Sequence, residues 1–209
     1  MVDLKPWDKH RDLTNERLVR VESVLVDVRE DALLSHEPEK GDGLWGYGCR
    51  AHERQIDAIK KLAGEVDWLT VLEDGRHFVF MIGKVPVRFY KGSANRPKPN
   101  SLQQRVPEIN AQQQAFSFAQ NQKWLWRFAI ETEATGKVSR IVVVAVSIAK
   151  KHGKEHLIDT HVRWEVPLAM PVRSIANLSS IQLPGKQLDK PVVRAKSRTK
   201  KNGTNDGGA

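Results

Sequence analysis

Acidic side chains on predicted strands are the first residues of this sequence that could do chemistry. Carboxylates that share a sheet face can hold a divalent metal, which activates water for hydrolysis. A nuclease of the restriction type would present an acidic-x-Lys triplet on a strand. The chain has Glu73 and Asp74 and then Lys84, but no such triplet on a strand. The other carboxylates that could meet across a sheet are Glu131, Glu133, Asp159 and Glu165.

Histidine and cysteine offer weaker candidates. His52, Glu53 and Asp57 could share one helix face and approach a metal, although solvated helix faces often carry such residues. The sequence contains no HExxH motif and no phosphate-binding glycine loop. We therefore assign no catalytic residue, no metal ligand and no cofactor. The only cysteine, Cys49, excludes an internal disulfide and favours a reducing, cytoplasmic location.

Basic residues on one strand and in the loop after it form the first candidate binding surface. If the outer face of an edge strand and this loop lie together, the patch combines positive charge with an aromatic ring. Single-stranded nucleic acid is held by that combination of charge and stacking. The predicted nucleic-acid-binding residues of the patch are Arg88, Tyr90, Lys91, Arg96, Lys98 and Arg105.

The C-terminal residues form the second candidate. Residues 186–209 contain seven Lys or Arg and two Asp, so they carry more than half of the net charge of +9. A cationic, unstructured segment binds phosphate backbones without sequence preference, through counterion release. A solubilising terminus without a ligand is the alternative explanation. The predicted nucleic-acid-binding residues of this segment are Arg194, Lys196, Arg198, Lys200 and Lys201.

The element that must position the patch is a hairpin over residues 78–92. Apolar and β-branched residues alternate there on both sides of Gly83-Lys84, which supplies the positive φ of a tight turn. Pro86 cannot donate to a sheet hydrogen bond, so its strand lies at an edge or has one unpaired side. Residues 67–73 precede this hairpin as a third strand, which makes an antiparallel meander.

Two helices precede the meander and a second group of strands follows it. Residues 14–34 form a helix capped by Thr14, and residues 51–64 form another. Residues 36–50 are expected to be a glycine-rich loop that tucks Trp45 and Tyr47 into the core. Residues 108–122 form a short helix, followed by strands at 124–132, 138–148 and 157–168. The predicted class is α+β: an antiparallel sheet of about five to six strands, two N-terminal helices on one face and a short inserted helix.

Composition limits the function that this architecture can serve. The chain has 209 residues, 40% apolar and 28% charged, and no apolar run near the ~20 residues of a membrane span. We expect a flexible lead-in at 1–13 anchored by Trp7, one domain at 14–183, and a disordered basic tail at 184–209.

Three functions stay open at this stage. We expect a non-enzymatic protein that associates with nucleic acid through the tail and the edge-strand patch. The alternative is a protein–protein adaptor or inhibitor, such as the partner of a toxin or defence enzyme. A metal-dependent hydrolase with a carboxylate site is the second alternative. Nucleic acid or a protein is thus the expected partner, a membrane is not, and the sequence does not set the oligomeric state.

Overall fold

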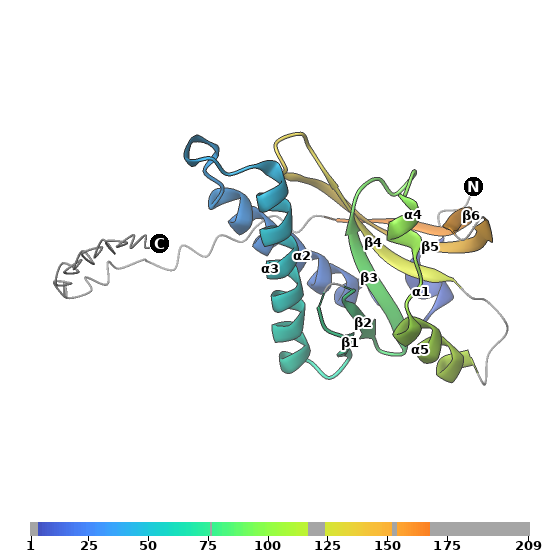
Figure 1. The fold of residues 1–209 in the computed structure, drawn as a ribbon. Coiled ribbons are helices and arrows are strands. Elements are labelled where there is room, and N and C mark those ends of the chain that lie inside the picture. The colour runs from blue at the N-terminus through green and yellow to red at the C-terminus, as the bar shows by residue number, and fades with distance from the viewer. Residues whose placement is uncertain (1–3, 76, 117–123, 152–153, 168–209) are drawn as a thin grey trace, which may run out of the picture. The chain divides into compact units, whose positions relative to one another are not determined.

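A computed structural model describes residues 4–75, 77–116, 124–151 and 154–167. They form one six-stranded sheet in which the strands follow their order along the chain (Figure 1). The strands are β1 (Leu69–Glu73), β2 (Val79–Ile82), β3 (Val85–Lys91), β4 (Leu125–Thr132), β5 (Val138–Lys151) and β6 (Lys154–Val166). The predicted α+β class is confirmed, as are both predicted groups of strands. The predicted domain end at 183 and the basic tail lie outside the described residues.

The sheet has one parallel pair, β3 with β4, and its other neighbours are antiparallel. β3 is therefore an interior strand between β2 and β4, so the predicted edge position is wrong, and the predicted alternative, one unpaired side at Pro86, is confirmed. Pro86 is tolerated there because it faces Met81 on β2, while pairing with β4 begins one residue later, at Val87. The parallel pair also places the carboxyl ends of β3 and β4 next to each other.

Two long helices cover one face of the sheet, as predicted. Helix α2 (Asn15–Leu34) begins after Thr14, whose hydroxyl accepts a hydrogen bond from the Arg17 N–H at 3.4 Å. Helix α3 (Leu44–Glu65) packs beside it. The apolar stripes of both helices meet one face of the strands in the larger of two main hydrophobic clusters, which includes Leu25, Ile59 and Phe80.

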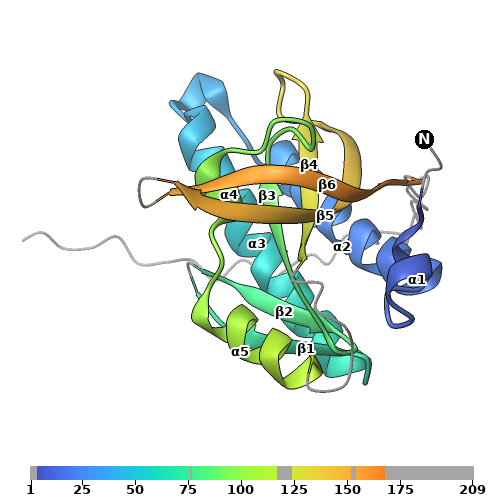
Figure 2. The ribbon, with the colours of Figure 1, turned by 90° about the vertical axis from the view of Figure 1, so that its right-hand side faces the viewer.

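The crossover from β3 to β4 covers the opposite face (Figure 2). It contains two short helices, α4 (Pro99–Leu102) and α5 (Val106–Phe116). Leu102 and Ala94 pack there on Leu125 and on alternate residues of β5. The sheet is thus covered on both sides, which explains why residues 125–130 of β4 and 141–146 of β5 are buried on both faces.

Helix α3 begins earlier than predicted, at Leu44 instead of residue 51. Tyr47 belongs to its buried stripe, and the Tyr47 hydroxyl donates to the Gly136 carbonyl at 3.0 Å. This anchor extends the helix through Gly46 and Gly48, which weaken a helix in isolation. Trp45 was expected in the core but is 84% exposed, because it points away from that stripe.

The first described residues contain a short helix, α1 (Pro6–Lys9), and a single-turn helix, η1 (Pro38–Lys40), connects α2 to α3. Trp7 of α1 contacts Trp164 of β6 edge-on, with ring centroids 5.2 Å apart, which agrees with its expected role as an anchor. Among the described helices, none is long and apolar enough to cross a membrane.

Candidate functional site

The carboxyl ends of β3 and β4 border a cavity of about 420 Å³. Ligands of open α/β sheets commonly bind outside the carboxyl ends of parallel strands, where the chain leaves the sheet. The last residues of both strands and the loop after β3 line the cavity. They are Lys91, Gly92, Ser93, Lys98, Glu131 and Thr132.

The loop over this cavity is held by three hydrogen bonds to residues of two strands, β4 and β6. The Gly92 N–H donates to the Ile130 carbonyl at 3.0 Å. The Ala94 N–H donates to Glu131 Oε1 at 2.8 Å, and Arg163 of β6 donates to the Asn95 side chain. The loop between β3 and α4 is therefore placed by the sheet.

The cavity carries uncompensated positive charge. Lys91 and Lys98 are both exposed on its walls. Burial lowers the pKa of Lys91, and the neighbouring cations Arg29 and Lys98 lower it further. Repulsion between like charges of this kind is relieved when an anion binds.

The carboxylate that lines the cavity does not neutralise these lysines. Glu131 accepts hydrogen bonds from the Ala94 N–H and from Arg140 Nε, each at 2.8 Å. Partial burial would raise the pKa of Glu131, but these two donors outweigh it and hold the pKa below its usual value. Arg140 also pairs with Glu165 at 3.3 Å, so the carboxylates of Glu131 and Glu165 both bind the same arginine.

Arg29 is a further cation at this end of the molecule, and the sequence analysis missed it. It lies in the buried stripe of α2, four residues after Leu25 and three before Ala32, and is only 2% exposed. Its guanidinium lies over the Tyr47 ring, 5.3 Å from the centroid. Its Nε and Nη2 atoms are buried and have no hydrogen-bond partner. The helical spacing of Arg29 from Leu25 and Ala32 places it on the buried face of α2. The sequence analysis expected only apolar residues on that face.

The predicted basic patch is split by the alternation of side chains along β3. Lys91, Arg96 and Lys98 point outward and are exposed. Arg88 and Tyr90 lie on the α4–α5 face, opposite to Lys91. Only part of the predicted patch therefore faces solvent.

The inward residues are held by hydrogen bonds. Arg88 Nη1 donates to the Gln103 carbonyl at 2.7 Å, and burial, followed by the charge of Arg127, lowers the pKa of Arg88 to about 10. The Tyr90 hydroxyl donates to the Ser93 carbonyl at 3.2 Å, and burial raises its pKa to about 12. Arg105 is half-buried beside them. The five predicted tail residues, from Arg194 to Lys201, lie outside the described residues.

The carboxylates considered for a metal site do not converge. Glu131 and Glu165 share Arg140, and Glu133 is exposed in the turn after β4. Asp159 pairs instead with His161 at 3.7 Å, toward the other end of β5 and β6. Within the described part of the chain, no three His, Cys, Asp or Glu side chains are grouped so that they could hold a metal.

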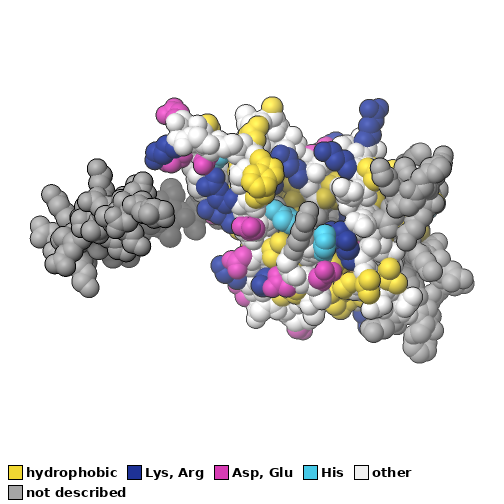
Figure 3. Space-filling model, viewed as in Figure 1, with side chains coloured by type: hydrophobic (Ala, Val, Ile, Leu, Met, Phe, Trp, Pro, Cys, Tyr) yellow, Lys and Arg dark blue, Asp and Glu magenta, His cyan; other side chains and the backbone are white. Residues whose placement is uncertain are grey.

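A second cavity, of about 460 Å³, lies between α3 and the turn after β1. It gathers Cys49, His52, Glu53 and Asp57 with Lys60 and Gly75. The His52 ring contacts Phe89 at 5.3 Å, and burial, followed by the charge of Arg88, lowers the pKa of His52. On this face, Lys and Arg side chains lie beside histidine and apolar groups (Figure 3).

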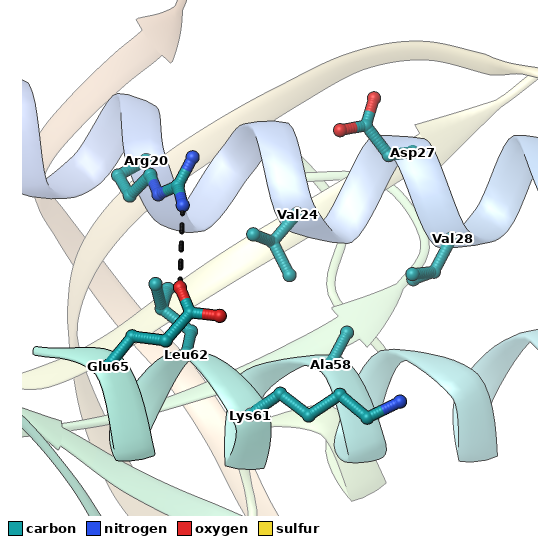
Figure 4. Close-up of a pocket in the computed structure, with 8 residues that line it drawn as sticks. All are labelled: Arg20, Val24, Asp27, Val28, Ala58, Lys61, Leu62 and Glu65. Atoms are coloured by element: carbon teal, nitrogen blue, oxygen red, sulfur yellow. Dashed lines mark ion pairs between the residues drawn. The ribbon is translucent and has the colours of Figure 1, made fainter. Parts of the chain in front are cut away.

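A third and smaller hollow, of about 210 Å³, lies between α2 and α3 on the side away from the sheet. Val24 and Val28 point toward Ala58 and Leu62 across it (Figure 4). Arg20 and Glu65 pair at 3.6 Å at one end. Its charged rim holds both signs in balance, so it has no preference for an anion.

Comparison of the chain with protein-family models, with curated proteins and with solved structures finds no match.

Proposed function

We propose that the protein is a non-enzymatic nucleic-acid-binding protein that holds the phosphate backbone at the carboxyl ends of β3 and β4. The observation that carries this proposal is the pair Lys91 and Lys98 on the walls of one cavity, whose carboxylate Glu131 is already held by other groups. Lysine ammonium groups bind phosphate oxygens and release counterions from the nucleic acid. Arg96, exposed in the same loop, extends the positive surface.

A charge-removal experiment tests this proposal. The double variant K91Q/K98Q removes both cavity lysines, and K60Q/K61Q removes two exposed lysines of α3 as a matched control. Fluorescence anisotropy with a labelled single-stranded oligonucleotide gives the binding constant over a range of salt concentrations. K91Q/K98Q should weaken binding and lower the salt slope by about 1.4, since each phosphate contact on a single strand contributes about 0.7.

The control should retain the wild-type slope. The proposal is wrong if the full chain shows no salt-dependent binding, or if the two double variants lose affinity equally. A duplex of the same sequence, measured in parallel, shows whether single or double strands are preferred.

A protein–protein adaptor is the second candidate, and one observation favours it. Leu34, Leu44 and Trp45 are 80%, 65% and 84% exposed, and all three flank the connection between α2 and α3. Large exposed apolar side chains that lie close together often mark interaction sites. A stoichiometric protein partner that survives nuclease and high salt would support this function. Loss of that partner in L44S/W45S would locate the contact, and retention would exclude this surface.

A further inference from the structure

The guanidinium of Arg29 is buried without a counter-ion among the described residues. A cation taken out of water is costly unless it is paired and hydrogen-bonded. Arg29 is 2% exposed, and its Nε and Nη2 have no partner. Among the described residues no carboxylate pairs with it, and the ring of Tyr47 is its nearest charge-stabilising neighbour. An apolar side chain at this position of the α2 stripe would avoid that cost.

The two unpartnered nitrogens define which ligand suits the position. Nε and Nη2 lie on the same edge of the planar guanidinium, and their N–H groups point in parallel. Two parallel N–H donors match two oxygens of one phosphate or carboxylate group. Arg29 therefore has one whole buried donor edge without an acceptor in the described part of the chain, and its geometry suits a bidentate anion.

Neighbours of Arg29 lie at the same end of the sheet as the lysine cavity, although Arg29 itself does not line that cavity. Tyr47, under the guanidinium, donates to Gly136 in the turn that follows β4. Thr132, at the end of β4, lines the cavity. Lys91 lies near enough that the charge of Arg29 contributes to its lowered pKa. Two cations from α2 and β3 thus stand at the same end of the sheet.

We propose that Arg29 and Lys91 form a site for a single phosphate monoester, such as the terminal phosphate of a polynucleotide. This inference rests on the proposed function and goes further, because it names the group that the site selects. A terminal phosphate carries up to two negative charges and three free oxygens, whereas an internal phosphodiester carries one charge. Arg29 would take two oxygens through its free edge, and Lys91 would offset the second charge.

The experiment compares two forms of one single-stranded oligonucleotide, identical except for a 5′-phosphate or a 5′-hydroxyl group. The label is on the 3′ end, and the full chain is used. The phosphorylated form should bind about tenfold more tightly, because a hydrogen bond to a charged group contributes about that factor. In R29M this ratio should fall to about 1, and in R29K it should fall in part, since lysine keeps the charge but lacks the fork.

K98Q is the matched control for the ratio of the two affinities, 5′-phosphate over 5′-hydroxyl. It should weaken both oligonucleotides by a similar factor and leave the preference for the 5′-phosphate. Circular dichroism and thermal unfolding establish that each variant is folded. The inference is overturned if the wild type binds both forms equally, or if R29M keeps the preference.

Inorganic phosphate separates this inference from the proposed function. Inorganic phosphate should raise the melting temperature of the wild type more than that of R29M at equal ionic strength, because its general salt effect acts on both proteins alike. If neither oligonucleotide binds but this difference is seen, the nucleic-acid proposal is wrong and the site serves a free phosphate or a nucleotide. If no oligonucleotide binds and phosphate stabilises R29M as much as the wild type, both proposals are wrong.

Discussion

Two arginine side chains are buried among the described residues, and their surroundings differ. Arg127 is fully buried, and its guanidinium donates to Glu108 Oε1 at 2.6 Å and to Glu108 Oε2 at 3.3 Å. It also donates to the carbonyls of Ser101 and Trp126. Within the described part of the chain, Arg29 has no such partner for its Nε and Nη2 atoms. Its hydrogen bonds and its ion pair explain why Arg127 is buried. The buried charge of Arg29 destabilises the fold unless a ligand binds its guanidinium.

The Arg127–Glu108 pair joins α5 to β4, and removing one member should be strongly destabilising. E108A leaves the Arg127 charge buried without its counter-ion, which costs about 3–5 kcal/mol of unfolding free energy. The double variant R127M/E108L removes both charges and should be closer to the wild type than E108A. Urea unfolding measures all three proteins. A double variant that is less stable than E108A would show that the pair is favourable in itself.

His52 should make stability depend on pH. Burial lowers its pKa, and Arg88 lowers it further, so the folded protein holds His52 neutral at pH values where the unfolded chain protonates it. The unfolded state therefore binds more protons below about pH 6.5, and the free energy of unfolding falls as the pH falls. H52Q should flatten this dependence below pH 6.5, as measured by urea unfolding at several pH values.

His10 provides the comparison for this titration. Its pKa is also lowered by burial, with an opposing contribution from Asp12, so part of the slope should remain in H52Q. H10Q should remove that remaining part. An H52Q protein with the full wild-type slope would show that His52 is not held neutral in the fold.

At the scale of elements, the hairpin between β2 and β3 depends on one glycine. Gly83 has φ of +58°, and a Cβ there would collide with the side chain of Asp12. Asp12 Oδ2 accepts the Lys84 N–H at 3.0 Å, so the carboxylate cannot move away without losing this bond. G83A should therefore lower stability by more than about 1 kcal/mol.

G64A is the matched control for this change. Gly64 lies in the last turn of α3, where a Cβ meets nothing within 4 Å. Alanine there should cause no loss and could add up to about 1 kcal/mol. Thermal unfolding compares the two variants. Equal stability of G83A and the wild type would mean that the turn adapts without strain.

The sequence predicts the elements whose determinants are local. The Thr14 cap and the Gly83 turn each depend on residues within a few positions, and both are present in the structure. The parallel pairing of β3 with β4 depends on contacts across a long crossover, which no local pattern encodes. The sequence therefore predicts an edge position or one unpaired side for this strand, and only the unpaired side, at Pro86, is found.

The candidate site was predicted in part for the same reason. Lys91 and Lys98 were found because they are basic and lie close together in the sequence. Arg29 comes from a distant helix, and the periodic stripe of that helix was assumed to be apolar. Arg88 was expected to face outward because its strand was placed at an edge, but α4 and α5 cover that face.

At the scale of the whole molecule, charge is distributed unevenly along the chain. Of the net charge of +9, residues 186–209 contribute +5. Two cationic regions therefore compete to explain any affinity for nucleic acid: the lysine cavity and the C-terminal segment. They differ in what they should recognise, because the cavity has a defined shape and the segment offers only a dense row of charges.

Neutralising the C-terminal segment should separate these two contributions. Replacing Arg194, Lys196, Arg198, Lys200 and Lys201 by Gln in the full chain removes five potential phosphate contacts. The salt slope of binding to a single strand should then fall by about 3.5, about two and a half times the change expected for K91Q/K98Q. The preference for a 5′-phosphate should persist, since Arg29 and Lys91 are unchanged. Anisotropy titrations with both oligonucleotides measure the two quantities together. An unchanged slope would remove the segment from the binding surface, and a lost preference would transfer the recognition of the terminal phosphate to it.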